Sequence, residues 1–296
     1  MKLYIMTEEN NKVGGGNTFQ RNFKKGLKSL GIPYQHCHGG FDWDVAFCPG
    51  ATMTTRYYWE LAQLKRTIGK KVVLRVDGVP EDWRNRGTGW SRLRDYAKQA
   101  DLVIYQSDYI ASTVGRLLGV PGPVIYNGVD TSVFRVAGPK LPRFGKPSIL
   151  YVNFRKGENN KRVEEAIERF RYYKLDNKDA TMTFVGNFSK KQFLWNSKHW
   201  DFGMLDMESK KDWQYLGIIK EREKLAEVMR SCDYIAFPSF ADPCPNTLIE
   251  AMSCGCKPLW INDYGGQKEI VDNFDTYDWS LRSMASRYVE EIEKIL

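Results

Sequence analysis

The chain has 296 residues, of which 42% are hydrophobic and 14% aromatic, and its net charge is +8. This composition excludes a largely disordered chain, and the length fits two domains of roughly 150 residues. Residues 1–147 carry 22 Lys and Arg against 12 Asp and Glu, which gives +10, whereas residues 148–296 carry 22 against 24, which gives −2. The basic half favours an anionic partner or a membrane surface about as strongly as it favours a merely solvated face.

The sequence contains no predicted export signal, membrane span or metal site. The first residues, Met1–Glu9, have too few apolar positions before their acids for a signal peptide and instead predict a buried strand. Six cysteines lack metal-ligand spacing and are expected to be reduced and buried. Asp42 and Asp44 form an Asp-x-Asp pair, which arises often by chance and is discounted as a metal site. We therefore expect a cytoplasmic protein, with peripheral membrane contact through the basic half as an open alternative.

The N-terminal half alternates short apolar runs with amphipathic stretches. Unbroken apolar runs are typical of parallel strands covered on both faces, and helical spacing of apolar residues predicts helices between them. The predicted strands are Lys2–Met6, Tyr34–Cys37, Asp44–Phe47, Lys71–Val76, Asp101–Gln106 and Val124–Tyr126. The predicted helices are Asn17–Leu30, Arg56–Thr67, Trp90–Ala100 and Ser107–Leu118.

A linker-like stretch rich in Gly and Pro, residues 136–147, precedes a second series of the same kind. Its predicted strands are Ser148–Val152, Thr181–Val185, Trp213–Leu216, Tyr234–Ala236 and Pro258–Ile261. Its predicted helices are Lys161–Tyr173, Lys220–Ser231, Thr247–Cys254 and a final one over Trp279–Leu296. The fold class is therefore α/β, with two tandem doubly wound Rossmann-like domains over residues 1–140 and 147–278 and a ligand cleft between them.

The segment from Ala236 to Val271 carries the most specific pattern in the chain. Asp242 and Glu250 are separated by seven residues, so that one acid lies in a Pro- and Cys-rich loop and the other inside the helix predicted to begin at Thr247. The first turn of such a helix offers unpaired N–H groups and a positive dipole end, which suit a diphosphate. On spacing alone, an ordinary loop and core helix is the favoured interpretation.

This segment resembles the donor-binding signature of family 4 retaining glycosyltransferases. The matching elements are Pro238-Ser239, Asp242, Glu250-Ala251-Met252, Gly265-Gly266 and Glu269-Ile270-Val271, and Asp242 departs from the Glu usual at its position. Similarity continues in Ala100–Ser107 and Val124–Phe134. The resemblance implies the two-domain GT-B fold, a nucleotide-sugar donor used without metal or cofactor, and a closing helix, residues 279–296, that crosses back to the N-terminal domain.

The resemblance also assigns the donor contacts. Glu250 is expected to bind the ribose hydroxyls, and Asp242 the sugar hydroxyls together with the backbone of Cys244, Pro245, Asn246 and Thr247. The base is expected near the strand ends at Asn187, Gly217 and Ile218. Gly14-Gly15-Gly16 alone is a weak signal, since a plain turn into a helix is more common, but its similarity to the family's glycine loop makes Gly15 and Gly16 donor-binding candidates.

Two cations after the first strand of the second domain, Arg155 and Lys161, are expected to straddle the diphosphate. The family carries an Arg and a Lys at similar spacing, although one extra residue precedes Arg155 here, so that Lys156 or Arg162 could take either role.

Asp77 takes a position at which many relatives have a histidine near the donor sugar. It ends the strand Val72–Asp77 and precedes Gly78, so that a turn-forming Asp-Gly and a catalytic carboxylate are about equally favoured. Trp83, Arg84 and Arg86 follow and could line the acceptor side or lie on a loop surface.

The sequence therefore predicts a retaining, metal-independent glycosyltransferase that uses Asp77, Arg155, Lys161 and Asp242 in catalysis. The expected partners are a nucleotide-sugar donor and a glycan, lipid-linked or protein-linked acceptor, without nucleic acid. One alternative is a sugar-nucleotide epimerase or hydrolase on the same fold, for which the chain offers few histidines. The other is a non-enzymatic binder of polyanions or nucleic acid, which the net charge suggests.

Overall fold

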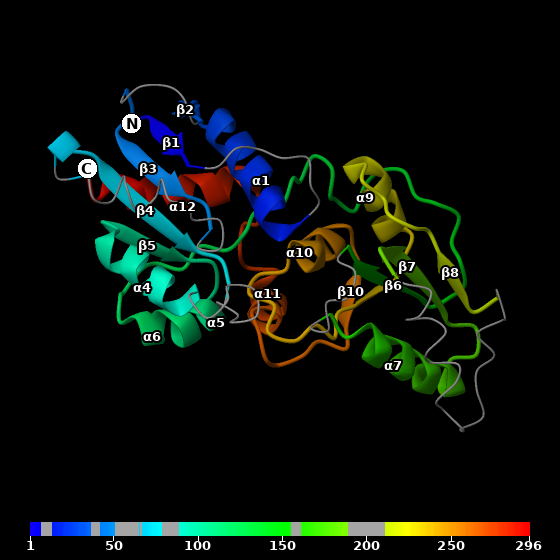
Figure 1. Cartoon of the computed structure of the whole chain (residues 1–296). Coiled ribbons are helices and arrows are strands. Elements are labelled where there is room, and N and C mark those ends of the chain that lie inside the picture. The colour runs from blue at the N-terminus through cyan, green and yellow to red at the C-terminus, as the bar shows by residue number, and fades with distance from the viewer. Residues whose placement is uncertain are drawn as a thin grey trace. The chain divides into compact units, whose positions relative to one another are not determined.

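The computed structural model describes residues 1–6, 14–36, 42–50, 65, 67–78, 89–154, 161–188 and 211–296. The chain forms two compact units, one comprising Met1–Val129 and Asp275–Leu296, and the other Asp130–Phe274. The described residues of each unit contain a five-stranded parallel sheet with helices packed on it (Figure 1). The predicted α/β class with two Rossmann-like units is confirmed. Most of the predicted helix Arg56–Thr67 lies outside the described residues.

The first sheet has the order β2-β1-β3-β4-β5, in which every described pairing is parallel. Its strands are β1 (Leu3–Ile5), β2 (Tyr34–Gln35), β3 (Val45–Cys48), β4 (Lys71–Val76) and β5 (Leu102–Tyr105). The predicted strand Val124–Tyr126 is reduced to one bridge between Val124 and Tyr105. Pro121 and Pro123 precede it and lack the N–H groups that a longer ladder would need.

Alternating side chains of this sheet enter two separate cores, as the strand period of two requires. Val45, Phe47 and Val73 pack with α1 (Gly15–Ser29) and α12 (Leu281–Glu293). The core on the other face contains Ala46, Cys48, Val72 and Leu74, which pack with α4 (Gly89–Gln99) and with a second helical stretch. This stretch consists of α5 (Asp108–Ile110), a π-helical turn (Ala111–Gly115) and α6 (Arg116–Leu118).

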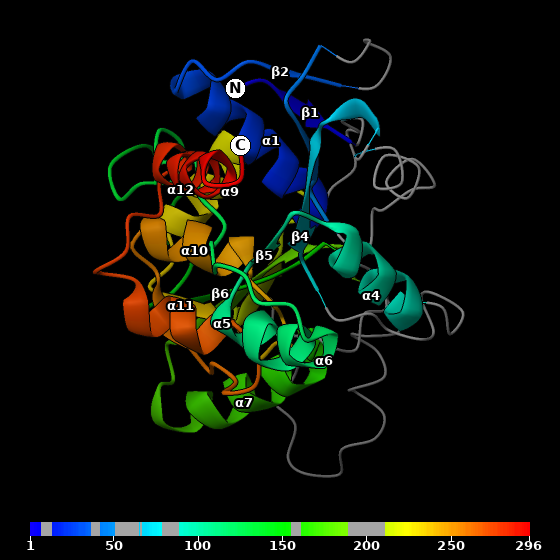
Figure 2. The same ribbon diagram turned by 90° about the vertical axis from the view of Figure 1, so that its left-hand side faces the viewer.

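Helices α1 and α12 lie side by side although they come from opposite ends of the chain (Figure 2). Gly26 allows this approach, because a Cβ there would lie 2.4 Å from the carbonyl oxygen of Leu281 and 2.7 Å from the Cβ of Ala285. The closing segment 279–296 therefore contributes α12 to the core of the first unit. Helix α12 begins at Leu281, two residues later than predicted, because the side chain of Ser280 accepts a hydrogen bond from Ser283 N and caps it.

The boundary between the units falls at Val129 and not in the 136–147 stretch. Val129 forms a parallel bridge to Ser280, which ties it to the first unit. The residues that follow are held by the second unit, where the guanidinium of Arg230 donates to the carbonyl oxygens of Val133 at 3.1 Å and Pro139 at 2.6 Å. The Gly- and Pro-rich stretch thus belongs to the second unit.

The second sheet has the order β10-β9-β6-β7-β8, again with parallel pairings. Its strands are β6 (Ser148–Asn153), β7 (Thr181–Gly186), β8 (Trp213–Tyr215), β9 (Tyr234–Ala236) and β10 (Lys257–Leu259). Its helices are α7 (Val163–Asp176), α9 (Arg222–Arg230), α10 (Asn246–Ser253) and α11 (Gln267–Asn273). The short helix α11 was not predicted. Helix α7 begins two residues later than predicted, because Arg162 adopts a left-handed backbone with φ 50°.

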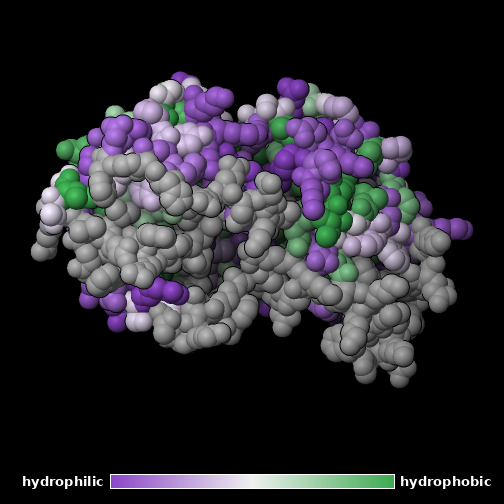
Figure 3. Space-filling view, turned by 45° about the horizontal axis from the view of Figure 1, so that its top comes forward, coloured by the Kyte–Doolittle hydropathy of each residue, from purple (hydrophilic) through white to green (hydrophobic). Residues whose placement is uncertain are grey.

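The described surface in Figure 3 is mostly hydrophilic. Among the described helices, none has both the length and the apolar character that crossing a bilayer requires. The described cysteines are free and buried, as expected, and burial raises the pKa of the Cys48 thiol to about 12.

Candidate functional site

The chain order of the second sheet reverses between β6 and β9. From β6 the chain proceeds outward through β7 and β8, and it then returns to the other side of β6 with β9 and β10. The carboxyl ends of β6 and β9 therefore meet at a topological switch point, where open α/β sheets bind their ligands. Lys161 follows β6 in the chain, and Asp242 follows β9, so that topology brings both predicted side chains to this edge.

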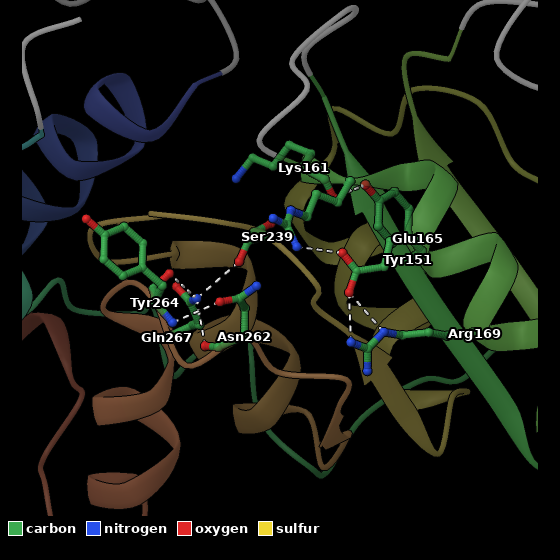
Figure 4. A network of polar contacts seen from close by, with 9 residues as sticks. Tyr151, Lys161, Glu165, Arg169, Ser239, Asn262, Tyr264 and Gln267 are labelled. Carbon is green, nitrogen blue, oxygen red and sulfur yellow. Dashed lines mark hydrogen bonds and ion pairs between the residues drawn. The ribbon is translucent and has the colours of Figure 1, made fainter.

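Lys161 and Asp242 form an ion pair between the Lys161 Nζ and Asp242 Oδ2 atoms. The hydroxyl of Tyr151 on β6 donates to the carbonyl oxygen of Lys161 at 2.7 Å and anchors its backbone to the sheet (Figure 4). The Lys161 Nζ atom also lies 5.6 Å from the ring centroid of Phe237, the first residue after β9. The pair thus holds one cation and one largely buried carboxylate at the switch point.

Glu250 is buried inside α10 and forms an ion pair with Arg222, the first residue of α9. The guanidinium carbon of Arg222 lies 4.5 Å from the ring centroid of Phe134. A buried carboxylate requires such a partner because desolvation strongly disfavours an unpaired charge. Arg222 was not predicted as a site residue, since no local pattern separates it from the other charged residues at the start of α9.

Between these two carboxylates, the N-terminus of α10 carries no side-chain cap. Pro245 is the capping residue, and its carbonyl oxygen accepts from Leu248 N at 3.1 Å. Cys244 and Pro245 are buried, whereas Asn246 and Thr247 are partly exposed at the first turn. The helix begins at Asn246, one residue earlier than predicted. The first-turn N–H groups and the positive end of the helix dipole would favour an anion at this end of α10.

The Gly265-Gly266 turn is joined to the loop that carries Asp242. Gly266 N donates to the carbonyl oxygen of Asp242 at 2.8 Å. A Cβ at position 266 would lie 1.9 Å from the carbonyl oxygen of Pro243, so that only glycine allows the two loops to approach this closely. The second glycine of the motif therefore fixes the backbone of the Asp242 loop.

Asn187, Gly217 and Ile218 come together at the ends of β7 and β8. Gly186 N donates to the carbonyl oxygen of Gly217 at 2.8 Å, and the Tyr215 hydroxyl donates to the carbonyl oxygen of Gly186 at the same distance. Asn187 N donates to the carbonyl oxygen of Asn153 at 2.8 Å, and Ile218 is exposed. These residues share the sheet edge at which Lys161 and Asp242 lie.

The first unit contains three of the remaining predicted positions. Gly15 and Gly16 open α1, with Gly15 exposed. Asp77 directly follows β4, and its carbonyl oxygen accepts from Gln106 Nε2 at 2.6 Å. Arg155 and its possible substitute Lys156 lie outside the described residues, as do Trp83, Arg84 and Arg86. The other substitute, Arg162, forms an ion pair with Glu165 at 2.7 Å.

A fully buried arginine two residues before Asp77 was also missed. Arg75 donates to Tyr288 Oη on α12 at 3.1 Å, to Asn127 Oδ1 at 2.7 Å and to Gln106 Oε1 at 2.5 Å. Its Nη1 atom lies 3.9 Å from Asp77 Oδ2. A charged residue inside the apolar run of β4 was the signal that could have revealed this network.

Asp42 and Asp44, discounted as a metal site, are both near Lys2. Asp42 accepts from Lys2 Nζ and Asp44 from Lys2 N. Within the part of the chain that the structure describes, no group of three or more His, Cys, Asp or Glu side chains is placed to hold a metal ion.

Comparison with solved structures supports the fold. HepE from Anabaena, in complex with UDP and glucose, is 14% identical, with a TM-score of 0.64 over 99% of this chain and 100% of that one. Sucrose-phosphate synthase from Thermosynechococcus elongatus is 13% identical, with a TM-score of 0.69 over 99% and 94%. The catalytic domain of starch synthase IV from Arabidopsis thaliana, bound to ADP and acarbose, is 12% identical, with a TM-score of 0.66 over 99% of both chains. The two units are thus those of the GT-B fold.

The family comparison addresses the sequence itself. No curated protein matches the chain. The model of the family described as "Glycosyl transferases group 1" matches residues 140–296, more than half of the chain, including the Lys161–Asp242 and Arg222–Glu250 ion pairs. The chain therefore belongs to the group 1 glycosyl transferases.

Proposed function

We propose that this protein transfers a sugar from a nucleotide-sugar donor to an acceptor hydroxyl, with retention at the anomeric carbon and without a metal ion. The Lys161–Asp242 pair at the switch point of the second sheet carries this proposal. The ammonium group suits a diphosphate oxygen, and the carboxylate suits sugar hydroxyls as hydrogen-bond donors. The structures of HepE with UDP and glucose and of starch synthase IV with ADP give the donor class its precedent.

The donor would lie along the carboxyl edge of the second sheet. Glu250 would accept hydrogen bonds from the ribose hydroxyls, with Arg222 holding its carboxylate in place. The first-turn N–H groups of α10, from Asn246 onward, would meet the diphosphate. The base would contact the segment formed by Asn187, Gly217 and Ile218, where exposed apolar surface is present.

The chemistry requires charge to be stabilised on the departing diphosphate. Lys161, together with Arg155, would supply this stabilisation as fixed cations, which is the role that a divalent metal has in other transferases. We propose a same-face reaction in which the bond from the anomeric carbon to the phosphate oxygen breaks while the bond to the acceptor oxygen forms. The acceptor proton passes to the leaving phosphate oxygen, so that no side-chain base is needed in the second unit.

Asp77 is the proposed contribution of the first unit to catalysis. Its position at the end of β4, with its carbonyl oxygen bound by Gln106, presents a carboxylate at the sheet edge typical of ligand sites. It would orient the acceptor hydroxyl or stabilise positive charge at the anomeric carbon. The acceptor is a glycan, lipid-linked or protein-linked hydroxyl. The first unit carries 21 Lys and Arg against 16 Asp and Glu, and this net charge of +5 favours an anionic acceptor or a membrane surface near this unit.

Thermal-shift measurements with UDP-, GDP- and ADP-sugars, with and without EDTA, test the donor. A donor at 100 times its dissociation constant should stabilise the protein by about 2.7 kcal/mol. The shift should persist in EDTA, fall in Glu250→Gln and remain in Asp77→Asn. Once a donor is found, NMR of the product should show the anomeric configuration of the donor. No shift with any of the three donor classes, or an inverted product, would contradict the proposal.

A further inference from the structure

Two partly exposed aromatic rings stack on one another beside the Asp242 loop. The ring centroids of Phe240 and Tyr264 are 4.6 Å apart with an interplanar angle of 19°. Their exposed fractions are 38% and 49%, which is unusual for such large side chains. The guanidinium carbon of Arg162 lies 4.9 Å from the Phe240 ring centroid, so that a cation borders the stack.

The loops that carry these rings are held rigidly from beneath. The fully buried Gln267 donates through its Nε2 atom to the carbonyl oxygens of Ser239 at 3.1 Å, Asn262 at 2.9 Å and Tyr264 at 2.9 Å (Figure 4). Figure 4 also shows that the Tyr264 side chain projects away from this amide. One buried side chain thus fixes both loops, so that the stack is a preformed surface.

The backbone on either side of the stack is strained. Arg162, with φ 50°, and Ala241, with φ 54°, adopt the left-handed conformation that residues other than glycine rarely take. Such strain persists only where the surrounding structure imposes it, and it concentrates at ligand sites. At these two positions it sets the directions of Arg162 and of the Phe240 loop.

The cation that borders the stack shares its carboxylate partner with a second guanidinium group. Glu165 accepts from Arg162 Nη1 at 2.7 Å and from Arg169 Nε at 2.9 Å, so that one carboxylate serves two guanidinium groups. A guanidinium has five N–H donors, and its fork geometry matches carboxylates and phosphates. The surface therefore combines flat apolar rings with an anion-binding group, which suits a ligand that presents C–H groups on one face and a negative substituent at its edge.

We propose that Phe240, Tyr264 and Arg162 bind a pyranose ring of the acceptor that carries an anionic substituent. The ring's C–H face would lie against Tyr264 and the edge of Phe240, and the substituent would meet Arg162. This inference rests on the proposed transferase function and deepens it by assigning the acceptor a chemical class. Because Asp242 lies two residues from Phe240, an acceptor held here is next to the proposed donor sugar.

Saturation-transfer NMR with simple sugars tests this surface directly. The probes are methyl α-D-glucopyranoside, its 6-carboxylate (the methyl glucuronide) and glucose 6-phosphate, which separate a carboxylate from a phosphate and from a neutral ring. The ring protons of one or both anionic probes should receive saturation, with an affinity about threefold or more above that of the neutral sugar. Arg162→Gln should remove this preference.

Substitutions locate the binding. Phe240→Ala and Tyr264→Ala should lose the probe signal, whereas Tyr264→Phe, which keeps the ring, should retain it. Tyr172→Ala is the matched control, because Tyr172 is a tyrosine of α7 in the same unit with 66% exposure. Donor thermal shifts measured on the Phe240, Tyr264 and Tyr172 variants should match the wild type. Equal saturation in wild type and Tyr264→Ala, or no preference for either anionic probe, would overturn the inference while leaving a normal donor shift, and thus the proposed function, intact.

Discussion

The Arg222–Glu250 pair gives a stability prediction that can be worked from the structure. Glu250 is buried, whereas the Arg222 side chain is 34% exposed. Removing one partner of a fully buried pair costs about 3–5 kcal/mol, and water at the Arg222 side reduces this to about 1–3 kcal/mol for Arg222→Met. A unit of this size loses roughly 2–4 °C in Tm per kcal/mol, so that the expected fall is about 2–12 °C.

The double variant Arg222→Met with Glu250→Leu sharpens this prediction. It removes both charges, and replacing a buried ion pair by apolar side chains is often neutral. Its Tm should therefore lie above that of Arg222→Met, within about 1 kcal/mol of the wild type. Arg169→Met is the control, since its pair with Glu165 is exposed and worth under about 1 kcal/mol. Differential scanning calorimetry without ligand measures the wild type, Arg222→Met, Glu250→Leu, the double variant and the control. A double variant that loses the sum of the single losses would refute the reasoning that Glu250 requires its partner.

Three further predictions concern other parts of the molecule. Tyr288→Phe removes the hydroxyl that accepts from Arg75 Nε, and leaving that buried donor unpaired should cost about 1–3 kcal/mol in thermal unfolding; an unchanged Tm would contradict the network. Gly266→Ala places a Cβ 1.9 Å from the Pro243 carbonyl oxygen and should abolish the donor thermal shift, whereas a shift of wild-type size would show that the loops can separate. The buried Cys48 thiol, with its pKa raised to about 12, should resist alkylation by iodoacetamide at pH 8, as measured by mass spectrometry. Because the thiol pKa is higher in the folded than in the unfolded protein, the contribution of Cys48 to the free energy of unfolding is present below about pH 9 and is lost as the pH rises toward 12.

The architecture could be predicted because it depends on local patterns. Apolar strands such as Ser148–Asn153 and Lys71–Val76 differ from their predicted limits by at most one residue, since burial on both faces of a parallel sheet leaves an unbroken apolar run. Helix limits were less accurate. Helix α7 begins only after Arg162, whose backbone is left-handed. The short helix α11 was not predicted because it has no long apolar periodicity.

The site was predictable only where its residues share one motif. Asp242 and Glu250 are recognisable because the segment around them resembles a family motif, and the topology then brings Lys161 to the same edge. Arg222 and Gln267 left no comparable signal, because their roles depend on contacts with residues that are distant in sequence. The buried amide of Gln267, for example, donates to three carbonyl groups that come together only in the folded chain.

The closing helix makes the first unit discontinuous, and this has a consequence for folding during synthesis. Phe19 and Phe23 on α1 pack against Tyr288 of α12, which the ribosome makes only after the whole of Asp130–Phe274. At about 5–20 residues per second, that intervening segment takes on the order of ten seconds to emerge. The second unit is contiguous and can finish folding in this interval. The part of the protein that is made first is therefore completed last, and its exposed aromatic core is the surface that a chaperone would have to protect until α12 arrives.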